Sequence, residues 1–243
     1  MKKIIFLLGL VSAFAFTSCD DNDGYSLDNY WIGMATVDKI SDSSNDFYLI
    51  LDNGDKLWPA ATNLPLYNPK DGQRVVANYT ILSDGNSRYD HDIKLNDVYQ
   101  VLTKPVMELT QANADSIGND PLRVLDAWVG SDYLNIEFEY PGYNKRHMVN
   151  LVYSDLFDNG GDAVNLQFRQ NGYGDEKRYW YRGIVSFDLT KLKKEGQTSV
   201  KLKVSSTDQN GTVSTFEVTY DWSNKAAQVT KTVKNLSNFV EVK

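Results

Sequence analysis

The sequence is poor in the residues that carry most enzyme chemistry. Its 243 residues include only two histidines, His91 and His147, and one cysteine, Cys19. It has no G-x-S-x-G elbow, no phosphate-binding loop and no H-E-x-x-H zinc motif. A Ser-His-Asp triad stays open, because its members can come from distant segments. We therefore expect a protein without catalysis or cofactor, and the alternative is an envelope hydrolase built around His91 or His147.

Positive charge and long hydrophobic runs are also scarce. The chain has 25 Lys and Arg against 32 Asp and Glu, a net charge of −7. Residues 27–104 alone have seven Lys and Arg against eleven Asp, a net charge of −4. Nucleic-acid binding needs a positive groove along the phosphates, so we exclude a nucleic-acid partner. No segment after the first 18 residues is apolar for long enough to span a membrane.

The N-terminus has the pattern of a lipoprotein signal peptide. Lys2 and Lys3 precede an apolar stretch of 13 residues, Ile4–Phe16, which is too short for a transmembrane helix. Thr17-Ser18-Cys19 follows as a lipobox, which predicts cleavage between Ser18 and Cys19 and a lipid on the cysteine. Each buried methylene contributes about 0.8 kcal/mol, so several acyl chains hold a domain on a membrane.

Two features of this segment leave an alternative open. Ala13-Phe14-Ala15 fits ordinary signal peptidase, which would leave Cys19 as a free thiol, and Phe16 stands where lipoboxes usually have leucine. Asp20, Asp21 and Asp23 then start the mature chain. They resemble the acidic export signal of Bacteroidetes lipoproteins, which predicts the outer face of the outer membrane. The alternatives are a solvated tether and the periplasmic face.

Alternating strands and tight turns predict an all-β fold. Apolar and polar residues alternate in 134–140, 200–204 and 216–222, which places the apolar side chains on one face of each strand. Asn53-Gly54 and Asn210-Gly211 lie between such strands and predict hairpins, because both residue types tolerate positive φ. Short strands with frequent turns favour barrels and sandwiches.

A domain boundary is expected near Pro105. Residues 27–104 carry five strand candidates, which suit a small OB-like barrel. Those candidates are Trp31–Ile40, Phe47–Leu51, Lys56–Ala61, Arg74–Leu82 and Ile93–Thr103. Residues 105–243 carry enough strands for an antiparallel β-sandwich, after a short helix expected within Met107–Ala114 and ended by Gly118. The predicted organisation is therefore a signal peptide (1–18), a tether (19–26), the barrel (27–104) and the sandwich (105–243).

Six short segments then form a recognisable series. They are Trp31-Ile32-Gly33, Asp46–Trp58, Asp115–Pro121, Trp128-Val129-Gly130, Tyr133–Ile136 and His147–Leu151. In this order they resemble the NigD-like lipoproteins of Bacteroidetes over nearly the whole chain. The resemblance implies an N-terminal OB-type domain and a C-terminal β-sandwich. It also suggests a bacteriocin-immunity role, and it supplies no catalytic residues.

An aromatic segment is the best candidate for ligand binding. Tyr179, Trp180 and Tyr181 stand between Arg178 and Arg182. In a strand, Tyr179 and Tyr181 share one face while Trp180 takes the other, so one face could stack on a sugar or a partner protein. The alternative is a strand buried on both sides, with the arginines covering its edge.

The remaining polar motifs favour ordinary structural roles. For His147 the plain interpretation is a strand-edge histidine bonded to a loop. Asp90-His91-Asp92 would hold a metal only in a loop, so no metal is expected. Asp115-Ser116-Ile117 fits a short O-glycosylation pattern, which makes Ser116 a possible acceptor.

These features predict a lipid-anchored, non-catalytic binding module of the cell envelope. Its partners would be the membrane, through the lipid, and an unknown protein or glycan. The alternative to free ligand recognition is a structural subunit of an outer-membrane complex.

Overall fold

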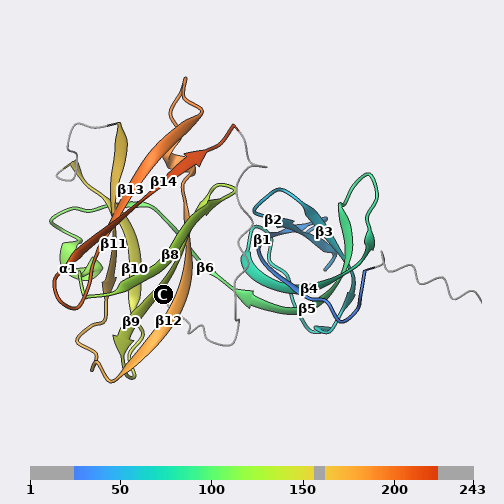
Figure 1. Ribbon diagram of the computed structural model, residues 1–243, viewed down its shortest axis with the longest axis horizontal. Helices are drawn as coiled ribbons and strands as arrows, with labels where there is room; N and C mark the ends of the chain where they lie inside the picture. Colours follow the sequence, from blue (N-terminus) through green and yellow to red (C-terminus); the bar gives the residue numbers. More distant parts are fainter. Residues whose placement is uncertain (1–24, 156–161, 224–243) are drawn as a thin grey trace, which may run out of the picture.

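The computed structural model describes residues 25–155 and 162–223. The predicted lipobox with Ser18 and Cys19, and the acidic residues Asp20, Asp21 and Asp23, lie outside the described residues. Within the described part, two β domains follow each other along the chain (Figure 1). No helix there has the length and apolar character that a membrane crossing needs. The predicted all-β class is confirmed.

The first domain is a closed five-stranded barrel with the strand order β1-β2-β3-β5-β4. Antiparallel ladders join most neighbours, and a parallel pairing of β3 with β5 closes the ring. Closure leaves no open sheet edge, and alternate side chains fill the interior with a compact apolar core. The strands are β1 (Trp31–Lys39), β2 (Phe47–Leu51), β3 (Lys56–Thr62), β4 (Arg74–Asp84) and β5 (His91–Gln100).

The second domain is a sandwich of two sheets. One sheet has the order β14-β13-β11-β10-β7 and the other β6-β12-β9-β8. Phe168 links the layers, with edge-to-face contacts to Phe138 at 5.0 Å and Phe187 at 5.8 Å between ring centroids. The strands are β6 (Leu102–Pro105), β7 (Met107–Glu108), β8 (Arg123–Gly130), β9 (Tyr133–Gly142), β10 (Met148–Tyr153), β11 (Ala163–Asn171), β12 (Tyr179–Asp188), β13 (Ser199–Thr207) and β14 (Val213–Asp221).

Local turn chemistry agrees with the sequence, while one helix differs. Gly54 and Gly211 have φ of 98° and 75° in the turns after β2 and β13, as the two predicted hairpins require. The helix α1 (Ala114–Ile117) does end at Gly118, but it starts later than expected. Met107 instead lies in β7, because it pairs with Val152 of β10. A 3-10 turn, η2 (Thr190–Leu192), follows β12.

The chain leaves the barrel earlier than the sequence suggests. Leu102–Pro105 forms β6, which runs parallel to β12 as an edge strand of the sandwich. Residues 102–104, which the strand count predicts within the barrel, are therefore part of the sandwich sheet. The candidate strand 93–103 accordingly divides between β5 and β6 at Val101.

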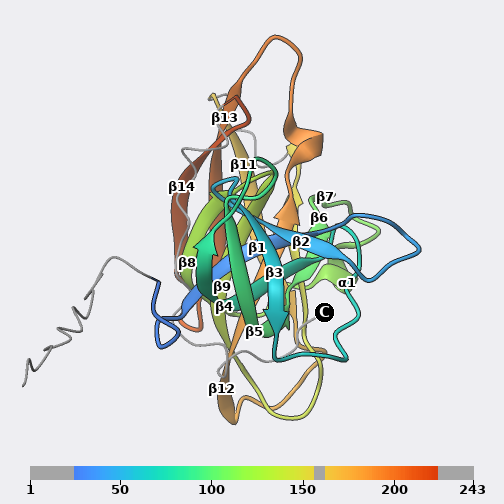
Figure 2. The ribbon, with the colours of Figure 1, turned by 90° about the vertical axis from the view of Figure 1, so that its right-hand side faces the viewer.

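The barrel packs on the outer face of the four-stranded sheet, and it overlies the sandwich in the view of Figure 2. Met34 and Val76 of the barrel meet Trp128 and Ile184 of the sandwich in a small apolar cluster. This contact converts part of an outward-facing sheet surface into an interior, which polar groups can enter only when they are paired.

A buried ion pair lies at the centre of this contact. The guanidinium of Arg74 donates to both carboxylate oxygens of Asp52, at 2.6 and 3.0 Å, and both side chains are almost fully buried. Asn135 of the sandwich accepts from Arg74 at 3.1 Å and donates to Asp52 at 3.1 Å, while Ser186 donates to Asn135 at 2.7 Å. Tyr133 covers the guanidinium, with its ring centroid 4.6 Å away.

Asp52→Ala should destabilise the protein strongly, because it leaves the charge of Arg74 buried without a partner. Removing one member of a buried pair costs roughly 3–5 kcal/mol, which urea unfolding at neutral pH would measure. Glu176→Gln is the matched control, since its exposed pair with Arg178 should contribute less than about 1 kcal/mol. Equal losses in the two variants would contradict a central role for Asp52.

Candidate functional site

The exposed end of β12 carries the aromatic segment singled out in the sequence. Val185 and Phe187 point into the sandwich core, and Tyr181 packs against that core from the same face. Ile184 and Ser186 lie on the opposite face, under the barrel. Trp180 shares this outer face by the two-residue period of the strand, but it lies beyond the barrel contact and is 54% exposed.

We define the aromatic patch as Tyr143, Tyr179, Trp180, Arg123 and Arg178. Tyr179 is 58% exposed, and its ring centroid lies 6.1 Å from that of Tyr143. The guanidinium of Arg178 lies 4.2 Å from the centroid of Tyr143, and that of Arg123 lies 5.5 Å from Trp180. Both distances fall in the range of cation–π contacts, so the arginines hold the rings in place.

Glutamates balance the arginines around the patch. Arg123 pairs with Glu139, and Arg178 pairs with Glu176 at 2.7 Å. Arg182, half-buried one step further along β12, forms an ion pair with Glu137. The surface therefore offers both donors and acceptors in fixed planes, without a strong surplus of either charge.

A shallow pocket of about 290 Å³ opens beside the exposed rings. Gln209 reaches it from the turn between β13 and β14, so both sheets contribute to its walls. The lining residues are Pro141, Lys177, Arg178, Tyr179, Trp180 and Gln209.

Backbone hydrogen bonds fix the position of Tyr143. Its N–H donates to Asp175 at 2.6 Å, and its carbonyl accepts from the hydroxyl of Tyr181 at 2.7 Å. The N–H of Arg178 donates to the carbonyl of Gly142 at 3.1 Å. Tyr181 thus supports the patch from the core side, while Tyr179 and Trp180 face the solvent.

His147 is a structural support beneath this loop. It is 3% exposed, with Nδ1 3.0 Å from Gln170 Oε1 and Nε2 3.1 Å from Asp175 Oδ2. Its ring packs on Tyr140, with centroids 4.5 Å apart, and a Cβ at Gly172 would come within 2.8 Å of it. Burial, with a smaller effect of Tyr181, raises the pKa of Tyr140 to about 12, so this neighbour stays neutral.

The residues around His91 are held by neighbouring strands. Asp90 accepts from the backbone N–H of Lys56 at 2.7 Å, and Asp92 accepts from Ser83 at 3.2 Å. His91 itself lies 3.9 Å from Asp84. Within residues 25–155 and 162–223, no group of three His, Cys, Asp or Glu side chains is arranged to hold a metal.

Ser116, the predicted glycosylation acceptor, lies exposed on α1. Its hydroxyl donates to the carbonyl of Asn113 at 2.9 Å. Glycosylation there stays a prediction.

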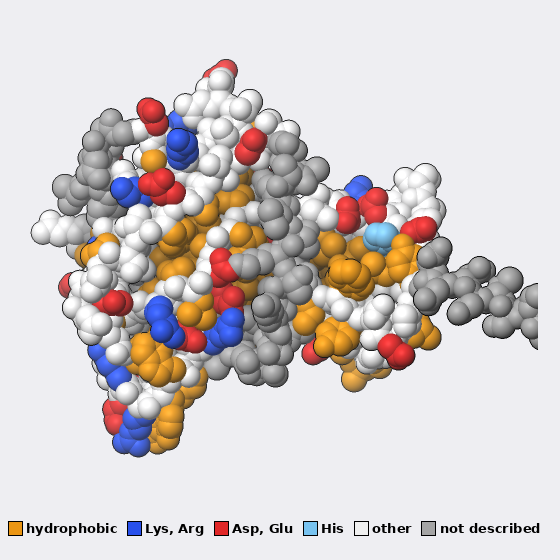
Figure 3. All heavy atoms as spheres, in the orientation of Figure 1, with side chains coloured by type: hydrophobic (Ala, Val, Ile, Leu, Met, Phe, Trp, Pro, Cys, Tyr) orange, Lys and Arg blue, Asp and Glu red, His pale blue; other side chains and the backbone are white. Residues whose placement is uncertain are grey.

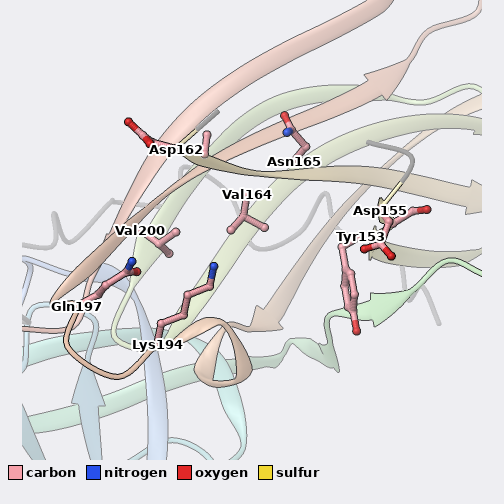
Figure 4. Close-up of a pocket in the computed structure, with 10 residues that line it drawn as sticks. Tyr153, Asp155, Asp162, Val164, Asn165, Lys194, Gln197 and Val200 are labelled. Carbon is pink, nitrogen blue, oxygen red and sulfur yellow. The ribbon is translucent and has the colours of Figure 1, made fainter. Parts of the chain in front are cut away.

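A second pocket of about 230 Å³ lies in the sandwich, and no sequence motif predicts it (Figure 4). Its polar lining includes Asp155 and Asp162 together with the more distant Lys194, and these residues form no sequence motif. Asp155 and Asp162 are the sequence neighbours of residues 156–161, which lie outside the described range, and we assign the pocket no role.

Asp175→Asn should reduce the acid sensitivity of the fold. Burial raises the pKa of the Asp175 carboxyl, but hydrogen bonds from Tyr143, His147, Asn144 and Lys145 outweigh it and hold the pKa well below its ordinary value of 3.8. The unfolded chain therefore takes up this proton first. The stabilisation is complete above about pH 4 and is lost as the pH falls towards the depressed folded pKa.

Urea unfolding at several pH values between 7 and 2 would test this. The wild type should lose more stability than Asp175→Asn below about pH 4, although the variant is weaker at pH 7. Glu176→Gln changes the exposed residue next to Asp175. Its unfolding free energy should therefore depend on pH as that of the wild type does. Parallel curves for all three proteins would contradict the assignment.

Two family models match the chain along most of its length. Residues 34–101 match the NigD-like N-terminal OB domain, and residues 105–220 match the NigD-like C-terminal beta sandwich domain. Among the curated proteins, none matches this chain.

Solved structures from Parabacteroides and Bacteroides species share both domains. A Parabacteroides distasonis protein, named as toxin-related, is 36% identical with a TM-score of 0.70, over 81% of this chain and 96% of its own. A Bacteroides vulgatus protein of unknown function is 30% identical with a TM-score of 0.73, over 88% of this chain and 100% of its own. A NigD-like immunity protein from Bacteroides caccae has 23% identity and a TM-score of 0.63, over 78% of this chain and 97% of its own. At this identity, the likeness supports a shared fold alone. The resemblance seen in the sequence is thus confirmed, and the chain belongs to the NigD-like family.

Proposed function

We propose that this chain is a non-catalytic binding protein, held on the cell envelope by a lipid on Cys19. Its contact surface is the aromatic patch, and its ligand is a glycan of largely neutral sugars. The observation that carries this proposal is the exposure of Tyr179 and Trp180, 58% and 54%, beside a pocket that both sheets line. Large aromatic side chains left in solvent and held by neighbours are typical anchors of recognition surfaces.

The chemistry of the patch favours sugars over charged ligands. A sugar ring presents an apolar C–H face, which stacks on an indole or phenol ring, and hydroxyls, which both donate and accept hydrogen bonds. The paired Arg123–Glu139 and Arg178–Glu176 groups supply both partners in fixed planes. A phosphate or a strongly acidic polymer would instead favour arginines that are not already neutralised.

The surroundings of His147 support a binding role rather than hydrolysis. Both of its ring nitrogens already contact Gln170 and Asp175, and the ring is buried. A general base must reach the proton that it removes. Here the imidazole would first have to give up one of its structural contacts.

The envelope location rests on the N-terminal sequence. The lipobox ending at Cys19 predicts the anchor, and Asp20, Asp21 and Asp23 predict export to the outer face of the outer membrane. A Bacteroides fragilis structure named as a lipoprotein has 13% identity and a TM-score of 0.54, so its likeness concerns the fold alone.

A protein ligand is the second candidate. The names of two structural neighbours refer to a toxin-related protein and to an immunity protein. An immunity role would use the same exposed aromatic patch to capture an incoming toxin, since Trp, Tyr and Arg are the favoured residues of protein interfaces as well.

Trp180→Ala should abolish most of the glycan affinity. Loss of a central aromatic anchor costs about 2 kcal/mol or more, roughly a 30-fold weaker Kd. Affinity electrophoresis in gels that contain neutral or acidic polysaccharides would measure it. Tyr153→Ala, in an exposed tyrosine of β10 outside the patch, is the matched control. Retardation by acidic polymers only would contradict the neutral-sugar proposal.

Cys19→Ala should release the protein from the membrane. Protease treatment of intact cells should remove the wild-type protein, because the acidic tether directs it outwards. Replacing Asp20, Asp21 and Asp23 by Asn should keep the lipid but reduce protease access. Protection of the wild type until the outer membrane is opened would place it on the periplasmic face.

A further inference from the structure

We infer that the N-terminal end of the barrel contacts the lipid bilayer through exposed aromatic and aliphatic side chains, here called the entry cluster. The cluster consists of Leu27, Tyr30 and Trp31, with exposed fractions of 74%, 67% and 53%. Its occupant is the interfacial layer of a bilayer with neutral or zwitterionic headgroups. The inference rests on the lipid anchor of the proposed function, and it adds a second, non-covalent membrane contact.

The entry cluster is held to the barrel rather than left as a free end. The hydroxyl of Tyr25 donates to Asp84 at 2.5 Å, and its ring meets His91 edge-on at 6.1 Å. A turn follows, in which the N–H of Asn29 donates to the carbonyl of Ser26 at 3.1 Å. Trp31 then starts β1 and pairs with Tyr79 of β4. The exposed side chains therefore sit on a supported segment.

The length of the tether keeps the entry cluster near the membrane. Six peptide steps separate Cys19 from Tyr25, which is about 22 Å at full extension. The headgroup layer itself is about 6 Å deep on each side of a bilayer. The tether therefore gives the cluster a high effective concentration at the interface, which favours even a weak contact.

The location of the entry cluster in the fold suits this contact. The start of the described chain, blue in Figure 1, lies on the side of the barrel away from the sandwich. Hydrophobic side chains are visible on the surface of the barrel as well as on the sandwich in Figure 3. A membrane on the barrel side would leave the sandwich, with its aromatic patch, directed towards the solution.

The charge around the entry cluster selects the lipid chemistry. No Lys or Arg occurs between Tyr25 and Asp38, whereas Asp28 is exposed within the segment and Asp84 lies beside Tyr25. Such a surface gains nothing from anionic headgroups, which attract basic segments. Tyr and Trp do favour the interface itself, where the ring is buried and its polar atom stays hydrated.

Fluorescence quenching by brominated phosphatidylcholine would test the inference. The full lipidated protein is placed in vesicles of this lipid, brominated near the headgroup end of the acyl chains. Trp31 should account for most of the quenched emission, so Trp31→Phe should remove most of the quenching. Trp180→Phe is the matched control, because Trp180 is exposed to the same degree, 54% against 53%, and should leave the quenching unchanged.

The outcomes separate the anchor from the contact. One outcome is that the wild type floats with the vesicles while Trp31→Phe and Trp180→Phe reduce the quenching by the same amount. This result would overturn the membrane contact of the entry cluster but would leave the lipid anchor supported. If the wild type fails to float, the anchor of the proposed function is overturned, and the contact with it. Because both replacements keep an aromatic ring at an exposed position, they should preserve folding, which circular dichroism would confirm.

Discussion

The structure depends on one constraint, the burial of the Arg74 charge between the two domains. A guanidinium removed from water needs a carboxylate and further acceptors in fixed directions. Asp52 of the barrel provides the carboxylate, and Asn135 of the sandwich provides the further acceptor. The fit is close, because a Cβ at Gly130 would come within 1.9 Å of the Asp52 carboxylate. The network thereby favours a single docking position of barrel on sandwich.

That docking position decides which surface remains for ligands. The outer face of β9 and β12 starts under the barrel, at Asn135 and Ser186, and ends in solvent at Trp180. This outer face therefore serves as a domain interface at one end and carries Trp180 of the aromatic patch at the other. The proposed lipid on Cys19 precedes the barrel, so the two proposed contacts lie on different domains and a membrane at the barrel would leave the patch accessible.

Local sequence patterns predicted most of the fold. Strand alternation and Asn-Gly turns act over a few residues, so the barrel strands and both hairpins were found close to their observed bounds. The differences arose where pairing is long-range. Met107 forms a strand because Val152 lies beside it, and Leu102–Pro105 joins the sandwich because β12 pairs with it. Neither partner is visible in the local pattern.

The sequence alone establishes the strands, the turns, the scarcity of catalytic residues and the aromatic segment of β12. Only the tertiary structure shows which polar residues are buried. Asn135 alternates with apolar neighbours, a pattern that predicts a place on the polar face of its strand, yet it is fully buried. The contact between His147 and Asp175 is also a tertiary one. It joins the residue just before β10 to the loop after β11, two segments that are distant in the sequence. The alternation of apolar and polar residues along a strand predicts which side chains share a face. Whether that face is exposed to solvent depends on the packing of the other domain against it.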